Sequence, residues 1–227
     1  CYVLVMVIFM MIILYGVMVA TSVTVEKSNR SIEVLVTSVD AKYLLFGKVF
    51  AGATAAIVQI SLILASALIG YNINHTYWGD KLDMILKIPG SVLAGFAVFG
   101  IGGFLFYAFL YGAMGALVSK TEDINKSAGT LQMLIMIVYF VVMFQLPTPD
   151  SVVMKVCSFL PFSSYSAMFV RIGMGSVTMA EIMTSAVILF VSTFAAGWLA
   201  AKIYRMGTLL YGNPIKLTTA LKNLKNN

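Results

Sequence analysis

The sequence has few side chains that could perform chemistry. It contains one histidine, His75, and its two cysteines, Cys1 and Cys157, form no metal-ligand pattern. It has no HExxH, CxxC or GxSxG motif, so the parts for zinc-dependent proteolysis or serine hydrolysis are missing. Gly47-Lys48 lacks the upstream glycine and the following Ser or Thr of a phosphate-binding loop. We therefore expect a protein that is not an enzyme and has no catalytic residue, metal ligand or cofactor of its own.

The apolar stretches of the chain also lack charged groups that could bind an ion. All nine acidic residues lie in loops or at the ends of these stretches. Carriers driven by protons or sodium usually keep a carboxylate within the bilayer, where a charge is costly and retained for function. Amides and hydroxyls at depth more often hold helices together. Those in the apolar stretches are Thr54, Gln59, Ser61, Ser66, Gln132, Gln145 and Ser192.

The composition indicates a membrane protein. Of the 227 residues, 60% are hydrophobic and 11% are charged, whereas a soluble domain has about 25% charged residues. Five stretches have the length of a membrane-crossing helix and are apolar on every face. We expect an all-α fold, a polytopic membrane bundle that forms one domain over residues 1–227. Its five transmembrane helices are predicted at about residues 1–24, 47–70, 91–118, 127–146 and 182–205.

The basic residues predict the orientation of the bundle. Segments 21–48, 119–130 and 202–227 fall on one side and hold eleven of the fifteen Lys and Arg residues. Loops rich in Lys and Arg stay in the cytoplasm. We therefore expect a multi-pass protein of the cell membrane with a cytoplasmic tail over residues 206–227. In this interpretation the positive residues behind the net charge of +6 set the orientation of the protein in the membrane. The lipid bilayer is therefore an expected partner, and nucleic acid is not.

The N-terminal end of the chain leads to a further expectation. Residue 1 falls on the outer side, and no signal peptide follows it. We therefore expect the chain to be truncated at its N-terminus, with at least one earlier span in the full protein.

Small residues recur every four positions in the third predicted span. Ala108, Gly112 and Ala116 lie on one helical face. Such stripes let helices approach closely. We expect this stripe to pack against another helix of the bundle or a second subunit.

The segment over about residues 25–39 has two contrasting faces. Val25, Ile32, Val36 and Val39 lie near one side of a helix, and charged residues lie largely on the other. This pattern is typical of an amphipathic helix at a membrane surface. The alternative is that the segment extends the first span. The charged residues are Glu26, Lys27, Arg30 and Glu33.

A second unusual segment covers about residues 152–174. It is apolar but interrupted by Pro161 and by several serines, which is too broken for one span. We predict a re-entrant pair of short helices on the outer side that turns at Leu160 and Pro161. The alternative is an exposed loop with an apolar face.

Four parts of the chain, in order, resemble the permeases of ABC-2 type transporters. Residues 16–35 (GVMVATSVTVEKSNRSIEVL) resemble the end of the second span in that family, and Gly47-Lys48 resembles the start of the next. Residues 111–119 (YGAMGALVS) are similar to the exit of the fourth span. Residues 158–164 (SFLPFSS) resemble the outer re-entrant segment, and residues 202–212 (KIYRMGTLLYG) resemble the C-terminal signature. The most similar branch is the sodium-efflux-type, NatB-like group.

The resemblance implies an assembly. Such permeases have six spans and a large external domain between spans one and two, so span one would precede this chain. Two permease subunits, identical or different, join two cytoplasmic ABC ATPases that bind the ATP. The resemblance assigns the segment over 25–39 to a coupling helix, with Glu26, Lys27, Arg30 and Glu33 contacting the ATPase or bracing this corner.

These observations together lead to a functional prediction. We expect the permease subunit of an ATP-driven ABC-2 type exporter, forming half of the translocation pathway. The alternative is a non-transporting membrane anchor or sensor, and a secondary carrier is less favoured. Sodium, a drug, a peptide and a lipid are all compatible substrates.

Overall fold

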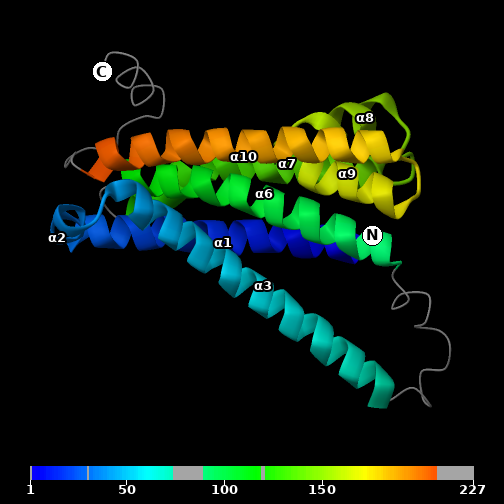
Figure 1. Cartoon of the computed structure of the whole chain (residues 1–227), viewed down its shortest axis with the longest axis horizontal. Coiled ribbons are helices and arrows are strands. Elements are labelled where there is room, and N and C mark those ends of the chain that lie inside the picture. The colour runs from blue at the N-terminus through cyan, green and yellow to red at the C-terminus, as the bar shows by residue number, and fades with distance from the viewer. Residues whose placement is uncertain (1, 30, 74–88, 119–120, 209–227) are drawn as a thin grey trace.

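The structure is a computed structural model that describes residues 2–29, 31–73, 89–118 and 121–208 (Figure 1). Every regular element in these residues is helical, so the expected all-α fold is confirmed. Among the described residues, five helices are long and apolar enough to cross a membrane: α1 (Tyr2–Ser28), α3 (Ala41–Ile73), α6 (Gly90–Leu117), α7 (Ile124–Gln145) and α10 (Met179–Thr208). The shorter elements are α2 (Ser31–Ser38), the 3-10 turn η2 (Thr121–Asp123), α8 (Val152–Phe159) and α9 (Ser164–Gly173).

The helix α6 is the centre of the bundle. It is the most deeply buried of the five long helices. It packs most extensively against α10 and α1, and it also contacts α3, α7 and α9. In Figure 1, α2 lies at one end of the bundle and the α8–α9 hairpin at the opposite end. We refer to these as the α2 end and the hairpin end.

Two glycines allow the helix backbones to touch at the α2 end. A methyl group at Gly115 of α6 would lie 2.5 Å from the carbonyl oxygen of Ala20 in α1. A methyl group at Gly207 of α10 would lie 2.5 Å from the carbonyl oxygen of Ala116. Neither carbonyl can move without moving its helix, so only glycine fits at both positions.

The boundaries of the helices near α2 differ from those expected. The amphipathic helix covers Ser31–Ser38 rather than 25–39, because α1 continues to Ser28. The helix α3 begins at Ala41 rather than near 47, because Asp40 accepts a hydrogen bond from the backbone N–H of Lys42 at 3.3 Å and caps its first turn. This hydrogen bond lowers the pKa of the Asp40 carboxyl.

The helix α3 is packed along only half of its length. Its buried residues all lie between Ala41 and Ala56. Beyond Ala56 the helix diverges from α1 and α6, as Figure 1 shows. Since this outer half is apolar, it is suited to contact lipid or another membrane helix.

Candidate functional site

The last turn of α1 covers the C-terminal end of α6. The Lys27 side chain is 2% exposed, and its ammonium donates a hydrogen bond to the carbonyl oxygen of Ala116 at 2.8 Å. The Thr24 hydroxyl donates to the carbonyl oxygen of Gly115 at 2.9 Å. The last carbonyls of a helix have no partner within the helix, and a positive charge is favourable beside them. The corner where α1 meets α2 is thus bonded directly to the central helix.

An ion pair joins the same corner to α3. The ammonium nitrogen of Lys48 lies 2.5 Å from a carboxylate oxygen of Glu26, and both side chains are partly buried. On α2, the side chain of Ile32 is buried in the core. Polar contacts of α1 therefore join this corner to α3 and α6, and α2 buries the side chain of Ile32 in the core.

The structure places the predicted coupling residues in different settings. Glu26 and Lys27 belong to α1 and point toward α3 and α6. Glu33 belongs to α2, of which only the backbone is described at that position, and Arg30 lies outside the described residues. Contact of these four residues with an ATPase stays a prediction.

The small-residue stripe lies inside the bundle. Ala108 and Ala116 are buried, and a methyl group at Gly112 would lie 2.6 Å from the Leu45 side chain of α3. Gly112 therefore faces α3, and Ala116 lies against Gly207 of α10.

The α8–α9 hairpin turns where the sequence contains Pro161. Ser151 caps α8 by accepting a hydrogen bond from the backbone N–H of Met154 at 3.2 Å. Leu160 ends α8 in an extended conformation, and the Ser163 hydroxyl donates to the carbonyl oxygen of Cys157 at 2.7 Å. These bonds fix a tight turn over residues 160–163.

The hairpin reaches deep into the bundle. Along α9, Ile172 packs against Gly95 of α6 and Tyr165 packs against Gly103. At the turn, the carbonyl oxygen of Phe162 accepts a hydrogen bond from the Tyr107 hydroxyl at 2.6 Å. The contacts from Gly95 to Tyr107 extend over about 18 Å of α6 at 1.5 Å per residue. The turn therefore lies beyond the midpoint of α6.

The sequence analysis missed a buried charge in this hairpin. Arg171 of α9 is 1% exposed, and its guanidinium lies 3.3 Å from a carboxylate oxygen of Glu181 in α10. It also donates to the carbonyl oxygen of Ser176 at 3.3 Å. The available signal was a charge within an apolar segment, which needs a partner.

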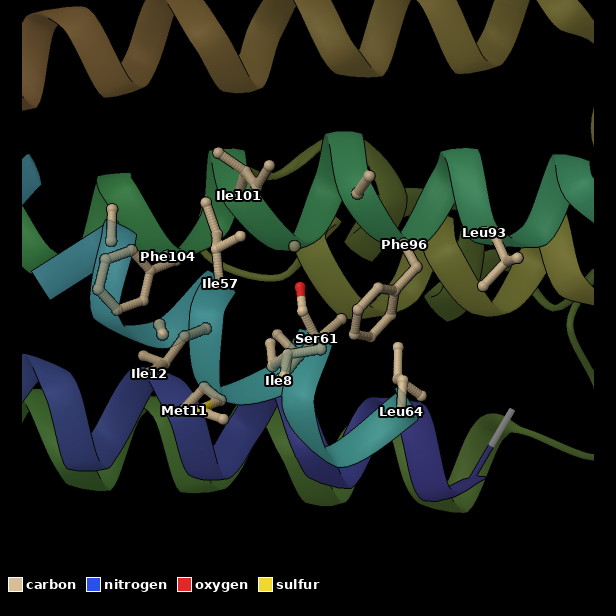
Figure 2. Close-up of a pocket in the computed structure, with 15 residues that line it drawn as sticks. Ile8, Met11, Ile12, Ile57, Ser61, Leu64, Leu93, Phe96, Ile101 and Phe104 are labelled. Carbon is tan, nitrogen blue, oxygen red and sulfur yellow. The ribbon is translucent and has the colours of Figure 1, made fainter. Parts of the chain in front are cut away.

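Two apolar cavities lie beside α6. The first, of about 250 Å³, lies between α1, α3 and α6 where α3 diverges. Figure 2 shows Ile57 and Ser61 of α3 facing Phe96 and Phe104 of α6 across it. The second, of about 470 Å³, lies between α6, α7 and α10 next to the hairpin turn. Within the described part of the chain, no group of three His, Cys, Asp or Glu side chains could hold a metal ion.

Comparison with known proteins identifies the family. A family model described as "ABC-2 family transporter protein" matches residues 2–202. The chain belongs to this ABC-2 family. The resemblance seen in the sequence is confirmed at the level of this family. The NatB-like branch stays a prediction.

Two relatives of this ABC-2 chain carry names without a function. It is 27% identical over 229 residues to the uncharacterized protein YhaP of Bacillus subtilis, covering 99% of this chain and 54% of YhaP. It is also 27% identical over 207 residues to the uncharacterized protein MJ1024 of Methanocaldococcus jannaschii, covering 90% of this chain and 48% of MJ1024. The chain therefore spans about half the length of the curated relatives it matches. No solved structure matches it.

Proposed function

We propose that this chain is the permease subunit of an ATP-driven exporter. It forms half of a translocation pathway with a second permease subunit, and a separate cytoplasmic ABC ATPase drives it through α2. The α2 end, with the C-terminus, faces the cytoplasm in this proposal, as the distribution of Lys and Arg residues indicates.

The single observation that best supports coupling is the bond between Lys27 and Ala116. A short surface helix can transmit a movement only if it is joined rigidly to the helices that must move. Lys27 lies one turn before α2, and its buried ammonium is bonded to the end of the most buried helix. A charge-assisted hydrogen bond in a dry site is stronger than one in water. A displacement of α2 would therefore reach α6 through the last turn of α1.

Site-specific crosslinking tests this proposal. The full-length protein is purified with its proposed ABC ATPase partner, and a cysteine is placed at Asn29, an exposed residue at the α2 end. A bifunctional thiol reagent should join this cysteine to the ATPase. A cysteine at Val152, which is exposed at the hairpin end, serves as the matched control and should not react with the ATPase.

The opposite pattern would contradict the proposal. If the ATPase co-purifies but crosslinks to Val152→Cys and not to Asn29→Cys, the coupling surface lies elsewhere. If no ABC ATPase associates with the full-length protein under any nucleotide condition, the chain acts as an anchor or sensor instead.

A further inference from the structure

The last turns of α1, α6 and α10 meet at one carbonyl group. The carbonyl oxygen of Ala116 in α6 accepts the 2.8 Å hydrogen bond from Lys27 of α1. A methyl group at Gly207 of α10 would lie 2.5 Å from the same oxygen. All three helices end at the α2 end of the bundle (Figure 1). The side chains that flank Lys27 and Gly207 therefore belong to one buried corner.

Tyr204 of α10 brings a polar group into this corner. It lies three residues before Gly207, so the two residues share one face of α10. Its side chain is 0% exposed, and its phenolic oxygen has no hydrogen-bond partner among the described residues. Buried hydroxyls in proteins are nearly always bonded to protein or to ordered water, because an unpaired one is costly. The Tyr204 phenol therefore calls for a partner.

Glu26 of α1 offers the complementary group. One of its carboxylate oxygens is held by the ammonium of Lys48, 2.5 Å away. The other oxygen, Oε2, is buried and also lacks a partner within the described part of the chain. The Tyr204 phenol and the Glu26 carboxylate are close enough to interact electrostatically. A donor of α10 and an acceptor of α1 are thus buried near each other without a bond between them.

Water is the ligand that fits these two groups. A water molecule can accept a hydrogen bond from the phenol and donate one to the carboxylate, so it satisfies both at once. Buried waters typically bind where protein polar groups are otherwise unsatisfied. An anion would be repelled by the carboxylate, and a cation would compete with the ammonium of Lys48, which already neutralises that carboxylate.

We propose that one buried water molecule binds between the Tyr204 phenol and the Oε2 oxygen of Glu26. The Glu26 carboxylate then connects α1 to α3 through Lys48 and to α10 through the water. The consequence for coupling rests on the proposed function as a permease. In that function, a movement of α2 would be passed from the last turn of α1 to α10 as well as to α3 and α6.

X-ray footprinting of the full-length protein in detergent tests the site. An X-ray pulse splits water into hydroxyl radicals that oxidise the side chains beside it, and mass spectrometry locates the oxidised residues. Tyr204 should be oxidised several times faster than Tyr107, although both side chains are 0% exposed. Tyr107 is the matched control, because its hydroxyl already donates to the carbonyl oxygen of Phe162.

A stability measurement gives a second, independent readout. Tyr204→Phe removes the hydroxyl and should raise the equilibrium constant of unfolding in urea about fivefold, the effect of one ordinary hydrogen bond. In a Glu26→Ala background the same change should have a smaller effect, because the water has lost its other partner. Tyr43→Phe, at an exposed tyrosine of α3, is the control and should leave the constant unchanged.

Three results would overturn the inference. Oxidation of Tyr204 as slow as that of Tyr107 would mean that no water is bound beside it. Equally fast oxidation of Tyr204 and Leu117, which is buried at the same end, would mean that bulk water enters the corner. Unchanged or increased stability of Tyr204→Phe would mean that the hydroxyl has no partner. None of these measurements needs an ATPase, so failure here leaves the crosslinking test of the proposed function unaffected.

Discussion

Arg171 and Glu181 form an ion pair that joins α9 to the first turn of α10, with 3.3 Å between the guanidinium nitrogen and the carboxylate oxygen. The same carboxylate accepts the backbone N–H of Thr178 at 3.0 Å, and the Thr178 hydroxyl lies 3.4 Å from the N–H of Glu181. This reciprocal pair is a capping box, so one acidic side chain both starts α10 and neutralises the buried guanidinium. The C-terminal end of α9 is therefore joined to the first turn of α10.

The first prediction concerns this ion pair. Glu181→Gln keeps the capping geometry but leaves the charge of Arg171 unpaired in a dry site. Removing one partner of a buried pair is destabilising. Because the Glu181 side chain is 34% exposed, solvent reduces the loss, which should still exceed that of the control below. Thermal unfolding of the purified protein measures this loss.

The control for Glu181→Gln is Asp123→Asn. It breaks the pair with Lys126, whose side chain is 83% exposed, and should change stability by less than about 0.5 kcal/mol. Equal effects of the two substitutions would show that Arg171 does not depend on Glu181.

The second prediction compares two helical glycines. Gly115→Ala would place a methyl group 2.5 Å from the carbonyl oxygen of Ala20 and should destabilise the bundle by more than about 2 kcal/mol. A methyl group at Gly129 meets no described residue within 4 Å, so Gly129→Ala should stabilise α7 by about 0.5–1 kcal/mol. Urea or thermal unfolding in detergent gives both values. The two substitutions should change the free energy of unfolding in opposite directions. If both stabilise the protein, α1 and α6 are further apart than the structure shows.

The third prediction concerns orientation. A cysteine at Asp150, near the hairpin end, should react with a membrane-impermeant maleimide in intact cells. A cysteine at Lys126, at the α2 end, should react only after the membrane is opened, because the basic loops are expected inside. Reaction of Lys126→Cys in intact cells would reverse the proposed orientation.

The spans could be predicted from sequence because apolar residues on every face leave a helix only a membrane or a core to enter. The break at Pro161 could also be predicted, since proline cannot continue a helix. The contacts at the end of α1 could not be predicted from the sequence. Lys27 is charged, so local pattern assigned it to a surface face, whereas its partner is the carbonyl oxygen of Ala116, 89 residues away.

The pairing of Arg171 with Glu181 was missed for a different reason. The two residues are ten positions apart and belong to different helices, and their contact requires the reversal between α9 and α10. The charge of Arg171 alone indicated neither that the side chain is buried nor that its partner is Glu181. Spacing predicts contacts within one helix, and contacts between helices depend on packing.

The fourth prediction concerns the contact that holds the hairpin turn. Tyr107→Phe keeps the ring but removes the hydroxyl that donates to the carbonyl oxygen of Phe162. The loss should be about 1 kcal/mol, the usual net value of one hydrogen bond. Hydrogen exchange should become faster at residues 160–167 and stay unchanged at residues 20–28. Tyr43→Phe, at an exposed tyrosine on α3, is the control and should leave exchange in the hairpin unchanged. Unaltered exchange in Tyr107→Phe would show that this bond does not hold the turn.

The last prediction concerns Lys27. Lys27→Met keeps an apolar stem of similar length but removes the ammonium that bonds to the carbonyl oxygen of Ala116. If α2 moves α6 through this bond, the variant should assemble with its ATPase yet lose most of the ATP hydrolysis that depends on transport. The measurement is the rate of ATP hydrolysis by the reconstituted complex compared with the rate of the ATPase alone. Lys126→Met removes an exposed charge and should behave like the parent. A purely structural role would lower expression and assembly of Lys27→Met together with activity, whereas normal assembly with full coupled activity would remove Lys27 from the coupling path.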